Sequence, residues 1–181
     1  NTALVGSYTV TYNVSDGAAN AAAETTRVVN VVDTVPPVIT LLGNAIETVE
    51  CATAYADAGV TALDACSGDL SASLVTVNPV NTSVIGSYTV TYDVTDGAGN
   101  AAVQAVRVVN VVDILPPLIT LNGITPVAVE CGTVYADAGA TALDLCDGDL
   151  TGAISVVNPV NTNIPGIYVV SYNVSDTASN A

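Results

Sequence analysis

Cysteine is the residue type in this chain whose spacing most directly suggests chemistry. The four cysteines form two equally spaced sets, Cys51 with Cys66 and Cys131 with Cys146. Because the second set follows the first by one sequence repeat, we predict that each repeat bridges its own two cysteines. A disulfide that closes a loop of about 15 residues stabilises a fold by about 3 kcal/mol. Disulfides indicate an oxidising compartment, and buried reduced thiols are the alternative.

Acidic side chains are the second candidate. Oxygen-rich spacing or a position at a repeat junction marks five candidate calcium ligands: Asp33, Asp113, Asp144, Asp147 and Asp149. Ca²⁺ takes roughly six to eight oxygen ligands. Against a site, Ser67 stands one repeat before Asp147, and no complete EF-hand loop is present. The alternative, that these acids cap turns and solvate the surface, stays open, and we assign no cofactor.

Composition argues against several function classes. Seventeen acids and two basic residues give a net charge of −15, which disfavours binding to nucleic acid or to acidic lipid headgroups. The chain has no histidine and no lysine, so the commonest general bases are missing and we expect no enzyme activity. No apolar run is long enough to span a bilayer. The 50% hydrophobic content favours a folded chain over disorder.

An interval of 80 residues organises the chain. The segment N-T-A-L-V-G-S-Y-T-V at Asn1 returns in related form at Asn81 and Asn161. Residues 34–101 and 114–181 are identical at about 38 of 68 aligned positions, which marks an array of like units. We predict three parts: residues 1–33 as the C-terminal part of a repeat, 34–113 as a complete repeat, and 114–181 as a repeat lacking its last strand. We expect the chain to be a window on a longer protein.

Strict alternation of apolar and polar residues marks the clearest strand, residues 86–95. We expect Thr89 and Thr91 to face water, and the opposite face to be buried. The predicted buried face holds Tyr88, Val90, Tyr92 and Val94. A turn signal, D-G-A-G-N, begins at Asp96. About seven short strands per repeat predict an all-β chain of tandem immunoglobulin-like β-sandwiches, in which the alanine-rich residues 18–24 form a turn and a strand start.

Two frames, Y-A-D-A-G-V-T-A-L-D from Tyr55 and G-S-Y-T-V-T-Y-D-V-T-D from Gly86, resemble bacterial immunoglobulin-like surface repeats of the hyaline-repeat kind. The resemblance covers nearly the whole chain. It implies immunoglobulin-like sandwiches in large secreted or surface-anchored proteins, often adhesins or stalks, and no enzyme activity. The repeats are joined by short linkers that contain proline, which restrict bending and predict a rod.

We therefore expect a structural segment of a long extracellular or cell-surface repeat protein: a stalk, fibre or adhesin shaft. Its expected partners are neighbouring immunoglobulin-like repeats in the same or adjacent chains. The alternative is that the repeats bind calcium, carbohydrate or a partner protein in adhesion. Three N-x-S sequons are predicted glycan sites: Asn13, Asn81 and Asn173.

Overall fold

Strands and turns make up this protein. The computed structural model describes residues 4–181, so the first three residues of the predicted first part lie outside the described residues. Within the described chain the helical segments are two short 3₁₀ turns, η1 (Ser71–Ser73) and η2 (Thr151–Ala153). The all-β prediction is confirmed. None of the helical segments in residues 4–181 is long and apolar enough to cross a membrane.

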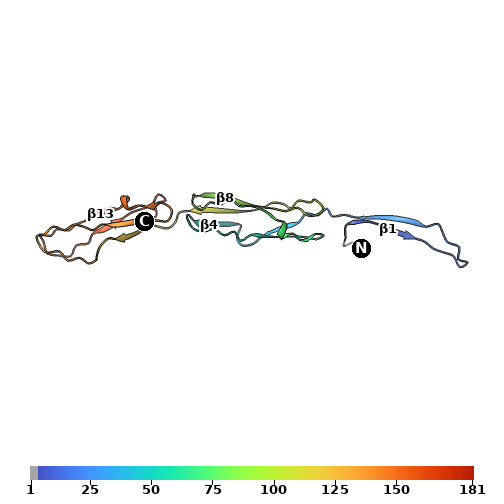
Figure 1. Cartoon of the computed structure of the whole chain (residues 1–181), viewed down its shortest axis with the longest axis horizontal. Coiled ribbons are helices and arrows are strands. Elements are labelled where there is room, and N and C mark those ends of the chain that lie inside the picture. Colours follow the sequence, from blue (N-terminus) through green and yellow to red (C-terminus); the bar gives the residue numbers. More distant parts are fainter. Residues whose placement is uncertain (1–3) are drawn as a thin grey trace. The chain divides into compact units, whose positions relative to one another are not determined.

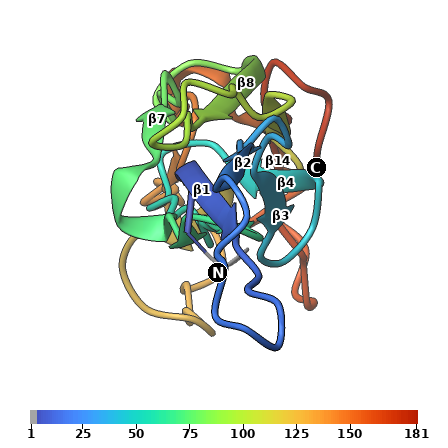
Figure 2. The ribbon, with the colours of Figure 1, turned by 90° about the vertical axis from the view of Figure 1, so that its right-hand side faces the viewer.

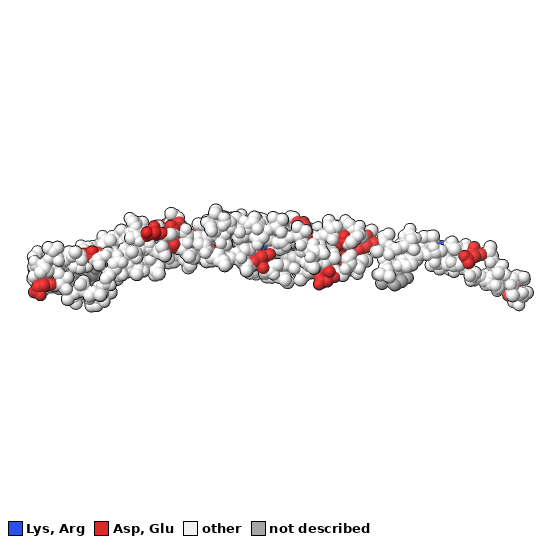
Figure 3. Space-filling model, viewed as in Figure 1, with Lys and Arg blue, Asp and Glu red and all other residues white. Residues whose placement is uncertain are grey.

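The described chain divides into two compact units. The first contains residues 4–45, Asp57–Pro79 and Thr89–Val108, and the second contains Ile46–Ala56, Val80–Tyr88 and Val109–Ala181. On the face shown in Figure 3, small groups of Asp and Glu side chains are scattered over the surface, and Lys and Arg contribute almost nothing to it. This agrees with the acidic composition.

Residues 34–113 form seven strands in two sheets, with the orders β3-β5-β6 and β4-β9-β8-β7 (Figure 1). The strands are β3 (Val38–Leu41), β4 (Ile46–Glu50), β5 (Val60–Asp64), β6 (Gly68–Asp69), β7 (Val75–Val77), β8 (Gly86–Asp93) and β9 (Ala105–Val112). β3 pairs with β5 and β7 pairs with β8, both antiparallel. Two sheets of short strands are the arrangement predicted for an immunoglobulin-like repeat.

Alternation along β8 places its side chains as predicted, with two small differences. Thr89 is exposed, whereas Thr91 and Tyr88 are half-buried. Three predicted core residues are buried: Val90, Tyr92 and Val94. β9 shows the same alternation, and its inward residues are at most 1% exposed: Arg107, Val109 and Val111. The period of two that set the prediction therefore determines which face is covered.

Residues 4–33 form an antiparallel hairpin of β1 (Gly6–Tyr12) and β2 (Thr25–Val31) (Figures 1 and 2). In the repeat these strands correspond to β8 and β9. The described residues before β1 supply no counterpart of the sheet β3-β5-β6, so side chains such as Val10 and Tyr12 are exposed. Residues 18–24 contain no helix, which confirms the prediction of a turn before β2.

Residues 114–181 form five strands, in sheets of order β10-β11-β12 and β13-β14. The strands are β10 (Leu118–Leu121), β11 (Ala140–Asp144), β12 (Gly148–Asp149), β13 (Ser155–Val157) and β14 (Ser171–Asn173). The counterpart of β4 is not a strand, and β14 is shorter than β8. In the complete repeat β9 lies between β4 and β8, and no residues of this chain correspond to β9 here. Pro126 also stands in place of Ile46 and cannot donate a ladder hydrogen bond.

Candidate functional site

A buried ion pair organises the core of the complete repeat. The Arg107 side chain is fully buried, and its Nη1 lies 3.1 Å from Oδ1 of Asp57. Its Nη2 donates hydrogen bonds to the carbonyl oxygens of Leu42 and Gly59. The hydroxyl of Tyr92 donates to Oδ2 of Asp57 at 2.6 Å. A guanidinium taken out of water must be paired and hydrogen-bonded, and here Asp57 and two carbonyl oxygens do this. Because Arg107 belongs to β9, these contacts fix the position of that strand.

This ion pair was not predicted from the sequence. Both arginines of the chain, Arg27 and Arg107, recur at the repeat interval, and so do Asp57 and Asp137. Arg107 also lies at one of the inward-facing positions, which recur at every second residue, of a valine-rich strand. An arginine at such a position needs a buried carboxylate partner, and this was the available signal.

Asp137 occupies the position of Asp57 in residues 114–181, but no arginine reaches it. The Tyr172 hydroxyl donates to Oδ2 of Asp137 at 2.6 Å, and the Tyr135 hydroxyl donates to Oδ1 at 3.0 Å. The hydrogen bond from Tyr172 lowers the pKa of Asp137, and the same bond raises the pKa of Tyr172 to about 12. Two phenols therefore hold a carboxylate that an arginine holds one repeat earlier.

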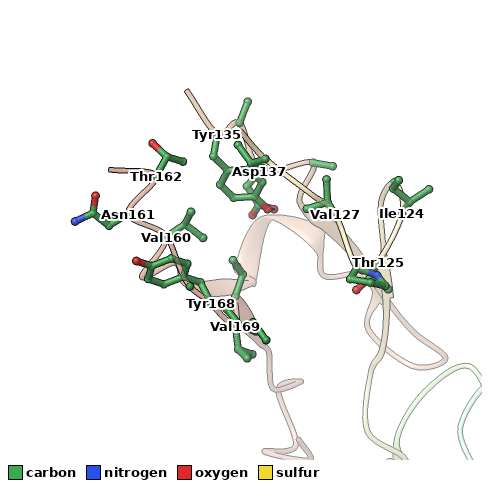
Figure 4. Close-up of a pocket in the computed structure, with 18 of the residues that line it drawn as sticks. Ile124, Thr125, Val127, Tyr135, Asp137, Val160, Asn161, Thr162, Tyr168 and Val169 are labelled. Atoms are coloured by element: carbon green, nitrogen blue, oxygen red, sulfur yellow. The ribbon is translucent and has the colours of Figure 1, made fainter. Parts of the chain in front are cut away.

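An open groove of about 960 Å³ surrounds Asp137. Figure 4 shows Tyr135 and Asp137 across the open space from Val160, Tyr168 and Val169. Apolar side chains along the groove are exposed, including Val127, Val129 and Val169. The groove lies among the counterparts of β4 and β8, where β9 packs in the complete repeat. The structure thus presents an unfilled strand position with a carboxylate at its centre.

The tyrosines at the start of each long strand make a second repeated contact. The Tyr8, Tyr88 and Tyr168 hydroxyls each donate to a carbonyl oxygen four residues earlier, at 2.8 to 2.9 Å. Each of these bonds ties the start of a strand to the turn before it. The contact is local in sequence, so it survives in every repeat.

The cysteine pairing differs from the prediction. Cys51 and Cys146 form a disulfide with their Cα atoms 5.6 Å apart, within the second unit. Cys66 and Cys131 are exposed free thiols. The predicted bridges within each repeat, between Cys51 and Cys66 and between Cys131 and Cys146, are therefore wrong. The observed bridge joins a residue of repeat 34–113 to a residue of repeat 114–181.

The pairing differs because Cys51 lies beside the residues where the chain leaves its repeat, whereas Cys66 lies beside the residues where the chain enters it. The Cys51 amide donates to the carbonyl oxygen of Val112, which ends β9 where the chain leaves the repeat. The Cys66 thiol lies within 4.8 Å of carboxylates of Asp33 and Asp64, where the chain enters it. Desolvation and these carboxylates raise the pKa of the Cys66 thiol. Equal spacing in sequence did not reveal that the two cysteines face different neighbours.

The candidate calcium ligands fall into different settings. Asp149 is exposed, and its Oδ1 accepts the Thr151 amide at 2.9 Å, which is the predicted turn-capping role. Asp33 likewise accepts the Val35 amide at 3.2 Å. Asp113 and Asp144 are buried, and carboxylate oxygens from the two lie within 4.8 Å of each other. Asp147 accepts two hydrogen bonds from Thr177. Only part of the predicted set is therefore brought together.

The turn acids cap their own turns in each repeat. Asp96 Oδ1 accepts the amides of Ala98 and Asn100 at 2.9 and 2.8 Å, and Gly99 takes a φ of 93° in the turn. Asp16 and Asp176 likewise each accept a hydrogen bond from the backbone amide of the Asn four residues later. The D-G-A-G-N signal therefore gave the correct turn.

Comparison with known proteins gives a family and distant relatives. Residues 39–111 and 119–181 match the family described as bacterial surface protein, Ig-like domain. Hyalin of Lytechinus variegatus is 35% identical over 167 residues, which cover 84% of this chain and 29% of that protein. Hyalin of Strongylocentrotus purpuratus is 34% identical over 124 residues, covering 64% and 10%. The chain thus spans less than a third of the length of these relatives.

Among solved structures, a lipoprotein from Bacteroides thetaiotaomicron is similar over 48% of this chain and 45% of its own, with 19% identity and a TM-score of 0.39. The family match covers both repeats that follow the first hairpin. The family is described as one of bacterial surface proteins, and this chain is extracellular or at the cell surface. The chain belongs to the family of bacterial surface protein Ig-like domains.

Proposed function

We propose that this chain is a structural segment of a long extracellular repeat protein of the hyaline-repeat kind: a stalk, fibre or shaft that serves adhesion. The observation that carries the proposal is the Cys51–Cys146 disulfide, which ties consecutive repeats together covalently. A bridge between repeats resists their separation under tension, as a stalk or shaft requires. The same acids recur in both repeats, as Asp57 and Asp137 do, which is not expected of a catalytic centre. This recurrence and the absence of histidine and lysine from the sequence support a protein without enzyme activity.

Neighbouring repeats are the partners that the groove around Asp137 fits. In the complete repeat the corresponding carboxylate binds Arg107 of β9. In residues 114–181 it accepts hydrogen bonds from two tyrosine hydroxyls and from the backbone amides of Ala138 and Gly139. A strand with the sequence of β9 would bring an arginine to Asp137. It would also bring valines to the exposed apolar residues of the groove and restore the missing ladder.

We propose that a strand of the same protein, and not of a second copy, occupies this position. The competing source is β2 of a second copy, whose Arg27 has the right position in the repeat. However, β2 already pairs with β1 along its full length, from Gly6 opposite Val31 to Tyr12 opposite Thr25. Donation by a second copy would require the insertion of a whole hairpin or the loss of that pairing. Continuation of the chain carries no such cost.

Denaturing electrophoresis of the native, reduced material tests the proposal. A continuous array gives a species far above the 18.1 kDa of this chain. A single band near that mass would overturn the array and favour strand exchange between copies. The exposed Asn13, Asn81 and Asn173 remain predicted glycan sites, and deglycosylation before electrophoresis separates their contribution to the mass from that of additional repeats.

A further inference from the structure

Three aspartates of the second unit are buried near one another. Asp113, Asp144 and Asp176 are 8%, 5% and 8% exposed. Oxygens of Asp113 and Asp144 lie within 4.8 Å of each other, beside the sulfur of Cys146. Oδ2 of Asp113 is buried without a hydrogen-bond partner among the described residues. A buried carboxylate oxygen that has no donor indicates that another group binds it.

The polar groups around these aspartates do not neutralise them. Asp144 accepts the amides of Cys146 and Asp147 through Oδ1, and both oxygens of Asp176 are used by Asn180. These donors are neutral. Glu50 brings a further carboxylate, held by the Ile114 amide at 3.2 Å and in contact with the Cys146 sulfur at 3.5 Å.

No basic side chain is available to balance this charge. The sequence contains no lysine or histidine, and its two cations are Arg27 and Arg107. Arg107 is committed to Asp57 in the first unit, and Arg27 lies over the Tyr12 ring in the first hairpin, also in that unit. Several carboxylates in a partly desolvated site repel one another unless a cation or a proton neutralises them.

A related but less buried arrangement occurs one repeat earlier. Asp33 and Asp64 lie within 4.8 Å of each other in the first unit, Asp96 is 7% exposed, and Oδ2 of Asp64 is buried without a described partner. These residues are the repeat counterparts of Asp113, Asp144 and Asp176. The two repeats therefore share a close pair of aspartates, but the pair is half-buried in the first unit and buried in the second.

We propose that Asp113 and Asp144, assisted by Glu50, bind a calcium ion in the second unit. Carboxylate oxygens are the ligands of a hard cation, and Ca²⁺ accepts an irregular set completed by water. Cys146 contributes no thiolate because it is oxidised, which disfavours zinc. Asp176 and Asp147 add negative charge around the ion. Asp149, exposed and occupied in a turn, is not a ligand.

Calorimetric titration of the oxidised, metal-free chain with CaCl₂ tests this site. The chain should bind calcium saturably, and Asp113→Asn should weaken binding at least about tenfold, since affinity follows the number of charged ligands. The matched control Asp149→Asn keeps its turn acceptor and should bind calcium like the unaltered chain. Absence of saturable binding would overturn the proposal, and so would equal binding by Asp113→Asn.

Thermal unfolding separates the ion from a simple protonated carboxyl. If calcium binds at Asp113, it raises the melting temperature of the unaltered chain more than that of Asp113→Asn. If the cluster is instead neutralised by a proton, neither protein responds to calcium or to chelator. That second result would contradict the proposal even if both proteins are well folded.

Discussion

The two repeats that match the family model contain the same hydrogen bond in different surroundings. The hydroxyl of Tyr92 lies 2.6 Å from Asp57, and that of Tyr172 lies 2.6 Å from Asp137. Tyr92 is 1% exposed, whereas Tyr172 is half-buried. The difference between the repeats is β9, which brings Arg107 to Asp57 and covers the core. The bond therefore forms without the last strand, and burial of the core requires it.

The largest predicted effect comes from removing the arginine of the complete repeat. Arg107→Ala leaves the buried Asp57 without its cation and should destabilise the repeat by about 3–5 kcal/mol. The matched change Arg27→Ala removes an arginine from the hairpin, where its neighbours are exposed. It should change stability by less than about 0.5 kcal/mol. Urea unfolding followed by circular dichroism measures the free energy of unfolding of both variants. Equal losses would show that the arginine of β9 matters no more to stability than the arginine of β2.

The disulfide gives the next effect. Cys146→Ala opens a covalent loop whose ends are 95 residues apart and should cost about 2–5 kcal/mol. Cys66→Ala, the change at the equivalent position one repeat earlier, removes a free thiol and should be close to neutral. Non-reducing peptide mapping should recover the Cys51–Cys146 link. Recovery of a Cys51–Cys66 link would restore the pairing within each repeat and contradict the structure.

Removal of a single hydroxyl sharpens the comparison between the two tyrosines. Tyr92→Phe leaves Asp57 with one donor fewer in a buried site and should cost about 1–3 kcal/mol. Tyr172→Phe should cost clearly less, because water reaches Asp137 and replaces the lost donor. The free energy of unfolding from urea titration measures both. A larger loss for Tyr172→Phe would show that the groove is less open than described.

The smallest effect is a shift in titration. The pKa of Tyr172 should be about 12, because its neutral hydroxyl donates a hydrogen bond to the Asp137 carboxylate. Its folded pKa exceeds the ordinary value near 10, so its stabilising contribution is complete below about pH 10 and lost as the pH rises through about 12. Absorbance at alkaline pH follows this phenol. Asp137→Asn should bring its pKa down toward the ordinary value, and an unchanged value would rule out the carboxylate as the cause.

Patterns that depend on neighbouring residues were predictable from the sequence. Alternation in residues 86–95 identified the buried Val90 and Tyr92, and the Asp96 turn followed from its Gly and Asn residues. Contacts between distant segments were not predictable in this way. The Cys51–Cys146 bridge and the Asp113–Asp144 contact depend on which turn of one repeat meets which strand end of the other, and residue spacing within a repeat carries no information about that.

The most direct test of the central claim is to supply the missing strand. Residues 102–113 can be copied directly after Ala181, and hydrogen–deuterium exchange compared with that of the original chain. A control extension carries glutamate in place of arginine at the Arg107 position, which opposes Asp137. The added strand should slow amide exchange in residues 127–130 and 166–170, and the control should not. Unchanged exchange in both segments would contradict the conclusion that the groove is an open strand position.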